Sequence, residues 1–366
     1  MTELMQASQQ WMMRPAEERF TSLNAMLDAS VTYRSEALTR VLPNRDMKAA
    51  PVEGVSNGLA LVMGGVPVVP SHYAFNQMAT LVGAPAGYLR TLPAPMVADC
   101  LNYGLISQRK VQEIGTLTHC PADTTGTLMA ATGPNYGRVW NDDIIRALVD
   151  RFGDGVTGDF TVPGEFGRAV KVDQANTTLY RSDRDMFVFL ADEKNRIEVP
   201  NRRDGKSGTM ARGFFLWNSE VGDKTLGIST FLFDYACSNR IVWGATEHKE
   251  MRIRHSSGAP HRWIEEMAPA LELYAHSSTV SIEAAIKATQ QARLGNEDDV
   301  SKFLHDRFTS NQAQAIKLAH IAEEDRPIET VWDAITGATA YAKKIGYTSD
   351  RIELERTAGK LIDLVA

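Results

Sequence analysis

Apolar residues recur at helical spacing near the start of the chain. From Ala16 to Leu42 there are few helix-breaking residues, and Pro43 interrupts the run. The apolar positions lie mostly three or four residues apart and are Phe20, Leu23, Met26, Leu27 and Val31. Because this spacing places side chains on one face of a helix, we predict that residues 1–50 are mainly helical.

The next segment has the pattern of a hairpin followed by helices. In residues 58–70, two apolar runs rich in valine flank Gly64-Gly65, a pair suited to the positive φ angles of a two-residue turn. Ser71 is the expected N-cap of a helix whose apolar face carries Phe75, Met78 and Leu81. Shorter helices are predicted over Tyr88–Leu92 and Pro95–Leu105.

Strand patterns dominate the middle of the chain and helix patterns its end. A strand over residues 127–133 and a helix over Asp142–Phe152 precede a glycine-rich stretch, residues 153–262, in which short apolar runs alternate with turns. The predicted strands there are Ala169–Val172, Met186–Leu190, Gly213–Asn218, Gly227–Phe233 and Arg240–Trp243. From residue 263 onward, long stretches of Ala, Leu, Ile, Glu and Lys contain few glycines, which predicts helices.

These patterns predict an α+β fold. It comprises a helical N-terminal part with a β-hairpin (residues 1–124), a central antiparallel β-rich domain (125–262) and C-terminal helices (263–366). The chain of 366 residues is long enough for two or three domains, and 43% hydrophobic and 23% charged residues are typical of a globular protein.

Net charge and the absence of targeting patterns narrow the function classes. A formal net charge of -6 argues against a surface that coats nucleic acid over its whole area, but it allows a local basic face. The three cysteines lack metal-type spacing, and no signal peptide or apolar stretch long enough to span a bilayer is present. We therefore expect a cytoplasmic protein without membrane contact.

Charge is distributed unevenly along the chain. Between Lys194 and Arg262 there are about 12 basic and about 7 acidic residues, whereas from Trp263 onward there are about 11 basic and about 17 acidic residues. Within the basic stretch the candidate nucleic-acid contacts are Arg202, Arg203, Lys206, Lys249, Arg252 and Arg254. Arg252 and Arg254 are preferred, because in a strand their spacing places both guanidiniums on one face.

Aromatic residues interleave with these basic residues. They are Phe214, Phe215, Trp217, Phe231, Phe233, Tyr235 and Trp243. Such side chains stack on the bases of single-stranded nucleic acid while basic groups hold the phosphates. Alternating aromatics in strands are also typical of a protein core, and the sequence leaves both interpretations open.

Motifs of known catalytic or metal sites do not match. Gly205-Lys206-Ser207 lacks the earlier glycine of a phosphate-binding loop, Ser219 is not in a nucleophile elbow, and the histidines lack zinc-site spacing. Asp183 and Asp185, with Glu220, are the best candidates for a metal-dependent enzyme. We expect no resident metal or cofactor and leave enzymatic activity undecided.

Several segments resemble the phage- and plasmid-associated proteins grouped as domain of unknown function 932. The matching segments include residues 14–20, 74–78, 83–90, 133–136, 252–255 and 330–333. The most distinctive matching residues are Asn218, Ser219, Glu220, Gly222, Cys237 and Asn239. Where such proteins usually continue Cys-Ser-Asn-Gly, this chain has Arg240. The resemblance implies a mobile-element setting, and it implies no catalytic residue.

Three functions remain open from the sequence. The first is a phage- or plasmid-type accessory protein of DNA metabolism that binds or anneals DNA in recombination or replication. In that role its partner would be DNA, single-stranded rather than double-stranded, and a homo-oligomer would suit annealing. The second is a non-enzymatic protein-interaction or host-takeover factor, marked by an exposed apolar patch on the C-terminal helices. The third is a metal-dependent enzyme acting on nucleotides or nucleic acid.

Overall fold

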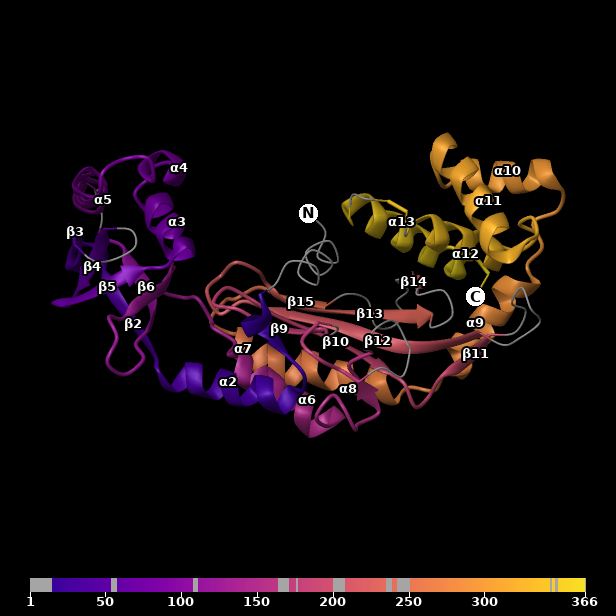
Figure 1. The fold of residues 1–366 in the computed structure, drawn as a ribbon, viewed down its shortest axis with the longest axis horizontal. Helices are drawn as coiled ribbons and strands as arrows, with labels where there is room; N and C mark the ends of the chain where they lie inside the picture. The colour runs from indigo at the N-terminus through magenta and orange to yellow at the C-terminus, as the bar shows by residue number, and fades with distance from the viewer. Residues whose placement is uncertain are drawn as a thin grey trace.

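The computed structural model shows an elongated α+β molecule with a sheet at its centre and a lobe at each end (Figure 1). The residues that the structure describes are 15–53, 58–107, 111–163, 171–175, 177–199, 208–234, 239–241, 251–342, 344–345 and 348–365. The predicted fold class is confirmed: strands form two largely antiparallel sheets, and the chain ends in helices.

The central sheet is built around three long antiparallel strands in the order β10, β12, β13. Its strands are β1 (Arg19–Phe20), β8 (Phe160–Thr161), β9 (Leu179–Arg181), β10 (Met186–Asp192), β11 (Ile197–Val199), β12 (Gly208–Asn218), β13 (Leu226–Asp234), β14 (Asn239–Ile241) and β15 (Met251–Ile253). Both β14 and β15 pair with β13, so they form the edge of the sheet in two pieces.

Helices cover the lower face of this sheet in Figure 1. They are α2 (Leu23–Ser35), α6 (Asn141–Phe152), α7 (Ala259–Arg262), the π-helical turn η3 (Trp263–Met267) and α8 (Ala268–His276). Met26 of α2, Leu148 of α6 and Trp263 of η3 share one core with Val188 and Phe214 of the sheet. Every residue of β10 is buried, because alternate side chains enter this core and an aromatic cluster on the other face.

That aromatic cluster decides between the two interpretations of the basic segment. Phe215, Trp217 and Phe231 are 1%, 5% and 0% exposed, and the rings of Phe215 and Phe231 stack at 4.3 Å between centroids. Phe214 is fully buried in the core beneath the sheet. The base-stacking interpretation is therefore wrong for these four side chains, because a ring that is buried in the protein core has no free face on which a base could stack. The side chains of Phe233, Tyr235 and Trp243 lie outside the described residues.

Close cross-strand packing explains two glycines in the long hairpin of β12 and β13. Gly213 faces Phe231, and Gly227 faces Trp217. A Cβ atom on Gly213 would lie 2.4 Å from the Phe231 ring, and one on Gly227 would lie 2.0 Å from the Trp217 ring. Only glycine leaves room for an aromatic ring across the backbone of the neighbouring strand.

The N-terminal lobe, residues 37–132, contains the second sheet. It consists of β2 (Ala37–Pro43), β3 (Met47–Pro51), β4 (Leu59–Met63), β5 (Val66–Pro70), β6 (Glu113–His119) and β7 (Thr127–Thr132), with α3 (His72–Leu81), α4 (Ala86–Leu89) and α5 (Ala94–Ser107). The predicted hairpin is confirmed, with Gly64 and Gly65 at φ +58° and +85° between β4 and β5, and Ser71 caps α3 by accepting a hydrogen bond from the Ala74 N–H.

Helix was the wrong prediction for residues 37–43 and 47–50. Residues 37–43 form β2, which pairs with β6 along its whole length from Ala37↔His119 to Pro43↔Glu113, and residues 47–50 belong to β3, which pairs with β4. The helical spacing is real as far as Ser35, where α2 ends. Beyond that point seven residues of antiparallel pairing outweigh a weak local helix preference, since strand formation depends on tertiary context.

The C-terminal helices form the other lobe. They are α9 (Val280–Gln291), α10 (Glu297–His305), α11 (Ser310–Glu324), α12 (Val331–Ala342) and α13 (Thr348–Lys360), followed by the 3-10 turn η4 (Ile362–Leu364). Their core includes Ile316 and Trp332 and continues onto the sheet through Met210 and Leu232. Within the described residues, no helix is long and apolar enough to cross a membrane.

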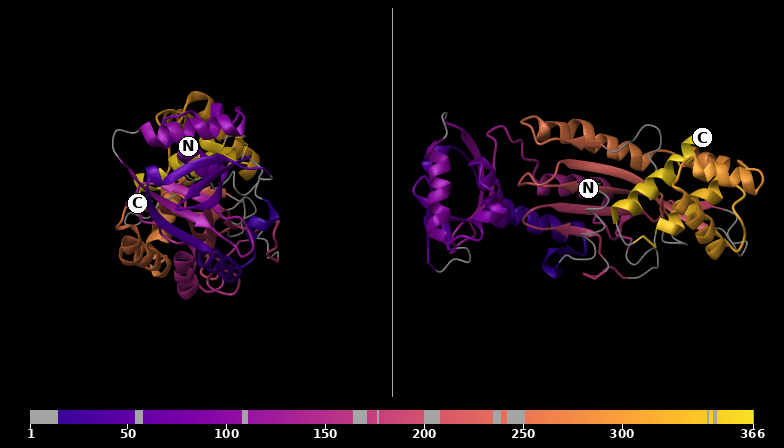
Figure 2. Two further views of the ribbon diagram at one scale, coloured as in Figure 1. Left: turned by 90° about the vertical axis from the view of Figure 1, so that its left-hand side faces the viewer. Right: turned by 90° about the horizontal axis from the view of Figure 1, so that it is seen from above.

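The three packed parts of the structure begin and end at other residues than the predicted domains. β7, expected in the central domain, belongs to the sheet of the N-terminal lobe. α2, expected in the N-terminal domain, and α8, expected among the C-terminal helices, both pack beneath the central sheet. Strand partners and buried faces determine these limits, and neither is visible as a change in composition. The views in Figure 2 show the same three parts from the end and from above.

Candidate nucleic-acid interface

The two preferred arginines lie at the edge of the central sheet. In β15, Ile253 is paired with Leu226 and is 2% exposed, so its side chain enters the core. Arg252 and Arg254 flank Ile253 and are both exposed. The guanidinium of Arg254 forms no hydrogen bond or ion pair with any described residue. We call Arg252 and Arg254 the β15 arginines.

The structure does not place the other predicted nucleic-acid contacts relative to the β15 arginines. Arg202, Arg203, Lys206 and Lys249 lie outside the described residues, as does Cys237. Asn239 is described only through its backbone, which begins β14 opposite Asp234.

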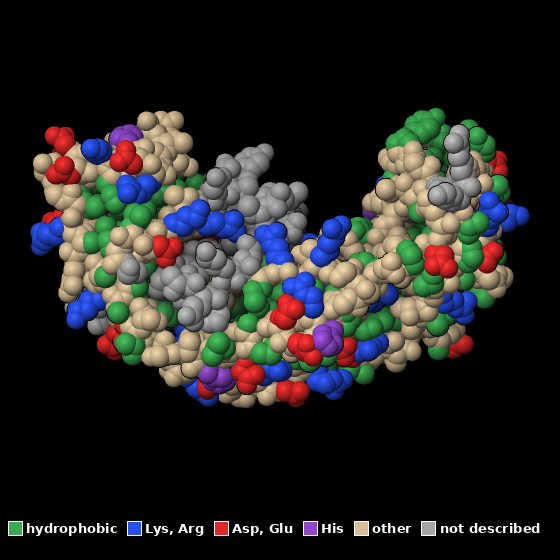
Figure 3. All heavy atoms as spheres, turned by 180° about the vertical axis from the view of Figure 1, so that it is seen from behind, with side chains coloured by type: hydrophobic (Ala, Val, Ile, Leu, Met, Phe, Trp, Pro, Cys, Tyr) green, Lys and Arg blue, Asp and Glu red, His purple; other side chains and the backbone are tan. Residues whose placement is uncertain are grey.

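The surface between the two lobes is hollowed. Seen from behind, the molecule curves so that the N-terminal lobe and the C-terminal helices rise on either side of the central sheet (Figure 3). Lys and Arg side chains lie along this hollow. A concave surface with basic side chains attracts anions, because several cations then act on one bound group.

The distinctive segment from Asn218 to Gly222 connects the end of β12 to the rest of the molecule through buried hydrogen bonds. The Asn218 side-chain amide donates to the Val139 carbonyl oxygen and to Asn141 Oδ1, both at 2.8 Å. Ser219 Oγ donates to the Arg184 carbonyl oxygen at 2.6 Å and accepts from a backbone N–H. Asn218 and Ser219 are both fully buried, so the two side chains join neighbouring loops.

Glu220 is a buried carboxylate with a structural role. It is 6% exposed, and its Oε1 accepts a hydrogen bond from the Asn141 N–H at 2.7 Å, at the start of α6. Burial raises the pKa of Glu220, while Arg181 and Arg138 act in the opposite direction. The Glu220 carbonyl oxygen also accepts from Arg138 Nε at 2.7 Å. A carboxylate that accepts from a helix N-terminus stabilises that helix end.

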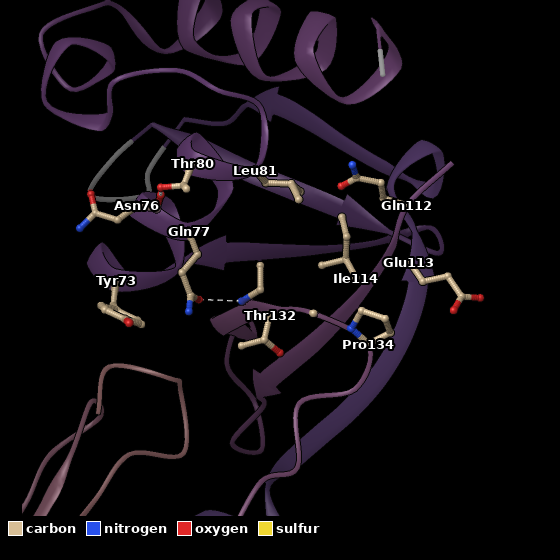
Figure 4. Close-up of a pocket in the computed structure, with 12 residues that line it drawn as sticks. Tyr73, Asn76, Gln77, Thr80, Leu81, Gln112, Glu113, Ile114, Thr132 and Pro134 are labelled. Carbon is tan, nitrogen blue, oxygen red and sulfur yellow. Dashed lines mark hydrogen bonds between the residues drawn. The ribbon is translucent and has the colours of Figure 1, made fainter. Parts of the chain in front are cut away.

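The same segment joins the N-terminal lobe to the central sheet. Gln77 of α3 donates to the Val221 carbonyl oxygen at 2.9 Å and accepts from the Ala131 N–H at 2.8 Å, the bond dashed in Figure 4. The Tyr136 hydroxyl donates to the Ser219 carbonyl oxygen at 2.8 Å. Gly222 has φ +89°, a conformation that suits glycine. The sequence singled out this segment, and the structure assigns it to the junction between lobe and sheet.

The carboxylates proposed for a metal-dependent enzyme are engaged elsewhere or dispersed. Asp185 is 4% exposed, accepts from Ser182 Oγ at 2.9 Å and pairs with Lys224. Asp183 is exposed on the neighbouring turn. Within the described ranges, no three His, Cys, Asp or Glu side chains are arranged to hold a metal ion. This arrangement gives the enzymatic alternative no support.

A groove that sequence reasoning missed lies where the lobe meets the sheet. This seam groove is a cavity of about 320 Å³ lined by Arg40 of β2 and by Tyr136, Arg138 and Trp140 of the chain leading to α6. The guanidinium of Arg138 lies 5.3 Å from the Tyr136 ring centroid and 5.6 Å from that of Trp140. About 100 residues separate β2 from this chain, so only the folded structure brings the groove residues together.

A second pocket adjoins the seam groove. It has a volume of about 660 Å³ and lies between α3, which contributes Tyr73 and Leu81, and the chain at the start of β6, where Gln112 precedes the strand and Ile114 belongs to it (Figure 4). We call it the α3 pocket. Thr132, Gly133 and Pro134 line both cavities, so this short segment forms the ridge between them.

Comparison with known proteins identifies the family. Searches of curated proteins and of solved structures found no match. A family model described as Domain of unknown function (DUF932) matches residues 168–360, which span the strands from β9 onward, the segment from Asn218 to Gly222 and all but the end of the C-terminal helices. Because this match covers more than half of the chain, the protein belongs to the DUF932 family.

Proposed function

We propose that this protein is a nucleic-acid-binding accessory factor of DNA metabolism that holds a phosphate backbone through the β15 arginines. The observation that carries the proposal is the exposure of Arg252 and Arg254 on either side of the buried Ile253, at the sheet edge. Arginine stays charged at all working pH values, and its planar fork matches two oxygens of a phosphate group. The proposal includes cytoplasmic action in a phage or plasmid setting.

The burial of the aromatic side chains changes the expected mode of binding. Because Phe214, Phe215, Trp217 and Phe231 are core residues, contacts from this segment go to phosphates and are independent of base sequence. Phosphate contacts alone give strong salt dependence and little distinction between sequences. A preference for single strands therefore needs base contacts from another part of the molecule.

Protein interaction is a second candidate function, and one observation favours it. Leu318 and Ile321 of α11 are 59% and 46% exposed and lie three residues apart. Residues at this spacing share a helix face. Exposed apolar residues on one face of a C-terminal helix suit a protein partner or a second copy of the chain.

Charge reversal of the β15 arginines tests the nucleic-acid function. In the double variant Arg252→Glu/Arg254→Glu we expect the affinity for labelled DNA to fall by about a hundredfold or more, since two attractive phosphate contacts become repulsive. The matched control is Arg146→Glu/Lys287→Glu, which makes the same charge change at exposed sites on α6 and α9. Fluorescence anisotropy reports the affinities, and circular dichroism reports whether both variants keep the fold.

Equal loss of affinity in the two double variants would assign binding to net charge and overturn the role of the β15 arginines. Wild-type protein that binds no DNA even at low salt would overturn the nucleic-acid function itself. In that case variants Leu318→Asp and Ile321→Asp, with oligomeric state measured by sedimentation, would test the protein-interaction candidate.

A further inference from the structure

We propose that the seam groove and the α3 pocket together form a seat for one nucleotide of a single strand, with the base in the α3 pocket and its phosphate at Arg138 in the seam groove. This inference rests on the proposed function and deepens it. The two cavities share the ridge formed by Thr132, Gly133 and Pro134, so one ligand that crosses the ridge reaches both.

The α3 pocket has the chemistry of a base site. Leu81 and Ile114 provide apolar walls, and Tyr73 adds an aromatic ring on the α3 side (Figure 4). Gln77 uses both ends of its amide within the protein, whereas the Gln112 side-chain amide has no hydrogen bond to any described residue. An apolar pocket with a few polar groups suits a planar base, and an amide can pair with a base edge.

The seam groove has the chemistry of a phosphate site. The Arg138 guanidinium is held in place because its Nε donates a hydrogen bond to the Glu220 carbonyl oxygen. Burial lowers the pKa of this guanidinium, which is the effect expected for a cation in a partly desolvated site. The Arg138 side chain thus lines one small cavity with its charge in place.

The seat supplies the strand preference that the β15 arginines lack. A base in a duplex is stacked and paired, so it enters a pocket only after it leaves the helix. The groove also lies close to the β15 arginines: the ring of His255, the residue after Arg254, stacks on the Tyr136 ring at 4.9 Å, and Tyr136 lines the groove. A strand held by Arg254 is therefore near the seat.

Filling the ridge tests the seat directly. A Cβ atom on Gly133 would meet no atom within 4 Å, and Gly133 does not have positive φ. Gly133→Phe is thus expected to fold normally while its ring occupies space between the two cavities. The matched control is Gly87→Phe on α4 of the same lobe, where an added Cβ also meets nothing within 4 Å.

We expect Gly133→Phe to weaken binding of a single-stranded 30-mer by about tenfold, the loss of roughly one base contact, and to leave double-stranded binding unchanged. Gly87→Phe should bind both as wild type does. Gln112→Ala, which removes the free amide of the base half, should cause a smaller loss. Single-strand affinity that is unchanged in Gly133→Phe would overturn the seat.

A second readout separates this inference from the proposed function. Saturation-transfer NMR with deoxyadenosine monophosphate should show binding to wild-type protein and to Arg252→Glu/Arg254→Glu but not to Gly133→Phe. Inorganic phosphate and deoxyadenosine, used as separate competitors, report the two halves. Nucleotide binding without DNA binding would support the seat and overturn the phosphate contact by the β15 arginines. DNA binding with no nucleotide signal in any protein would do the reverse.

Discussion

At the scale of single residues, the most distinctive side chains of the chain are structural. Asn218 Nδ2, Ser219 Oγ and Glu220 Oε1 form hydrogen bonds with backbone groups or with the buried Asn141 side chain. A catalytic group needs a polar atom that faces substrate, and here those atoms face the protein. The sequence could single out these residues, but all of the partners that define their role except Asp223 lie at least 35 positions away along the chain.

Ser219→Ala measures this structural role. The change leaves the Arg184 carbonyl oxygen and the Asp223 N–H without the bonds that they make with Ser219 Oγ at 2.6 and 2.9 Å. Two backbone groups that lose a buried partner cost about 1–3 kcal/mol in the free energy of unfolding. Urea denaturation should show this loss, while DNA affinity below the transition stays at the wild-type value. Loss of affinity in a fully folded variant would place Ser219 in the binding surface instead.

At the scale of elements, the sequence predicted what periodicity and turn chemistry determine. The hairpin at Gly64-Gly65, the helix Asn141–Phe152 and the C-terminal helices follow from local pattern. β2 was missed because its pairing with β6 is a long-range contact, and the seam groove was missed because its residues come from separate elements. The exposure of Arg252 and Arg254 was predictable, because a two-residue period around the apolar Ile253 is visible in the sequence.

The contact between α11 and α12 makes stability depend on pH. His320 is 1% exposed between these helices, and burial lowers its pKa to about 4. Thr336 lies 3.4 Å from its Nδ1, Asp333 lies 3.9 Å from its Nε2, and Arg326 pairs with Asp333. In the unfolded chain the histidine pKa is about 6.5. Protonation therefore favours the unfolded state, and stability is lost as pH falls from about 6.5 toward about 4.

Between pH 7 and pH 5 this histidine should cost the folded protein about 2 kcal/mol. Urea denaturation at both pH values measures the change for wild-type protein and for His320→Gln, whose side chain does not titrate. We expect the loss in the wild type to exceed that in the variant by about this amount. Identical pH dependence in the two proteins would show that His320 takes up no proton on unfolding in this range.

At the scale of the whole molecule, the family match and the proposed site divide the chain differently. The match over residues 168–360 covers most of the central sheet and the C-terminal helices, including the β15 arginines. The N-terminal lobe, which contributes Arg40 and the α3 pocket, precedes it and has its own core around Leu61 and Met78. Backbone binding by the β15 arginines is therefore expected to belong to the matched part, and the nucleotide seat, with its preference for single strands, to the part of the chain that precedes it.

The measurement that tests the central claim most directly is the salt dependence of single-stranded DNA binding by wild-type protein and by Arg252→Gln/Arg254→Gln. Each phosphate contact on a single strand adds about 0.7 to the slope of log affinity against log salt concentration. The account predicts a salt-sensitive wild type and a double variant whose slope is smaller by about 1.4. Equal slopes in the two proteins would show that the β15 arginines hold no phosphates, and would contradict the account.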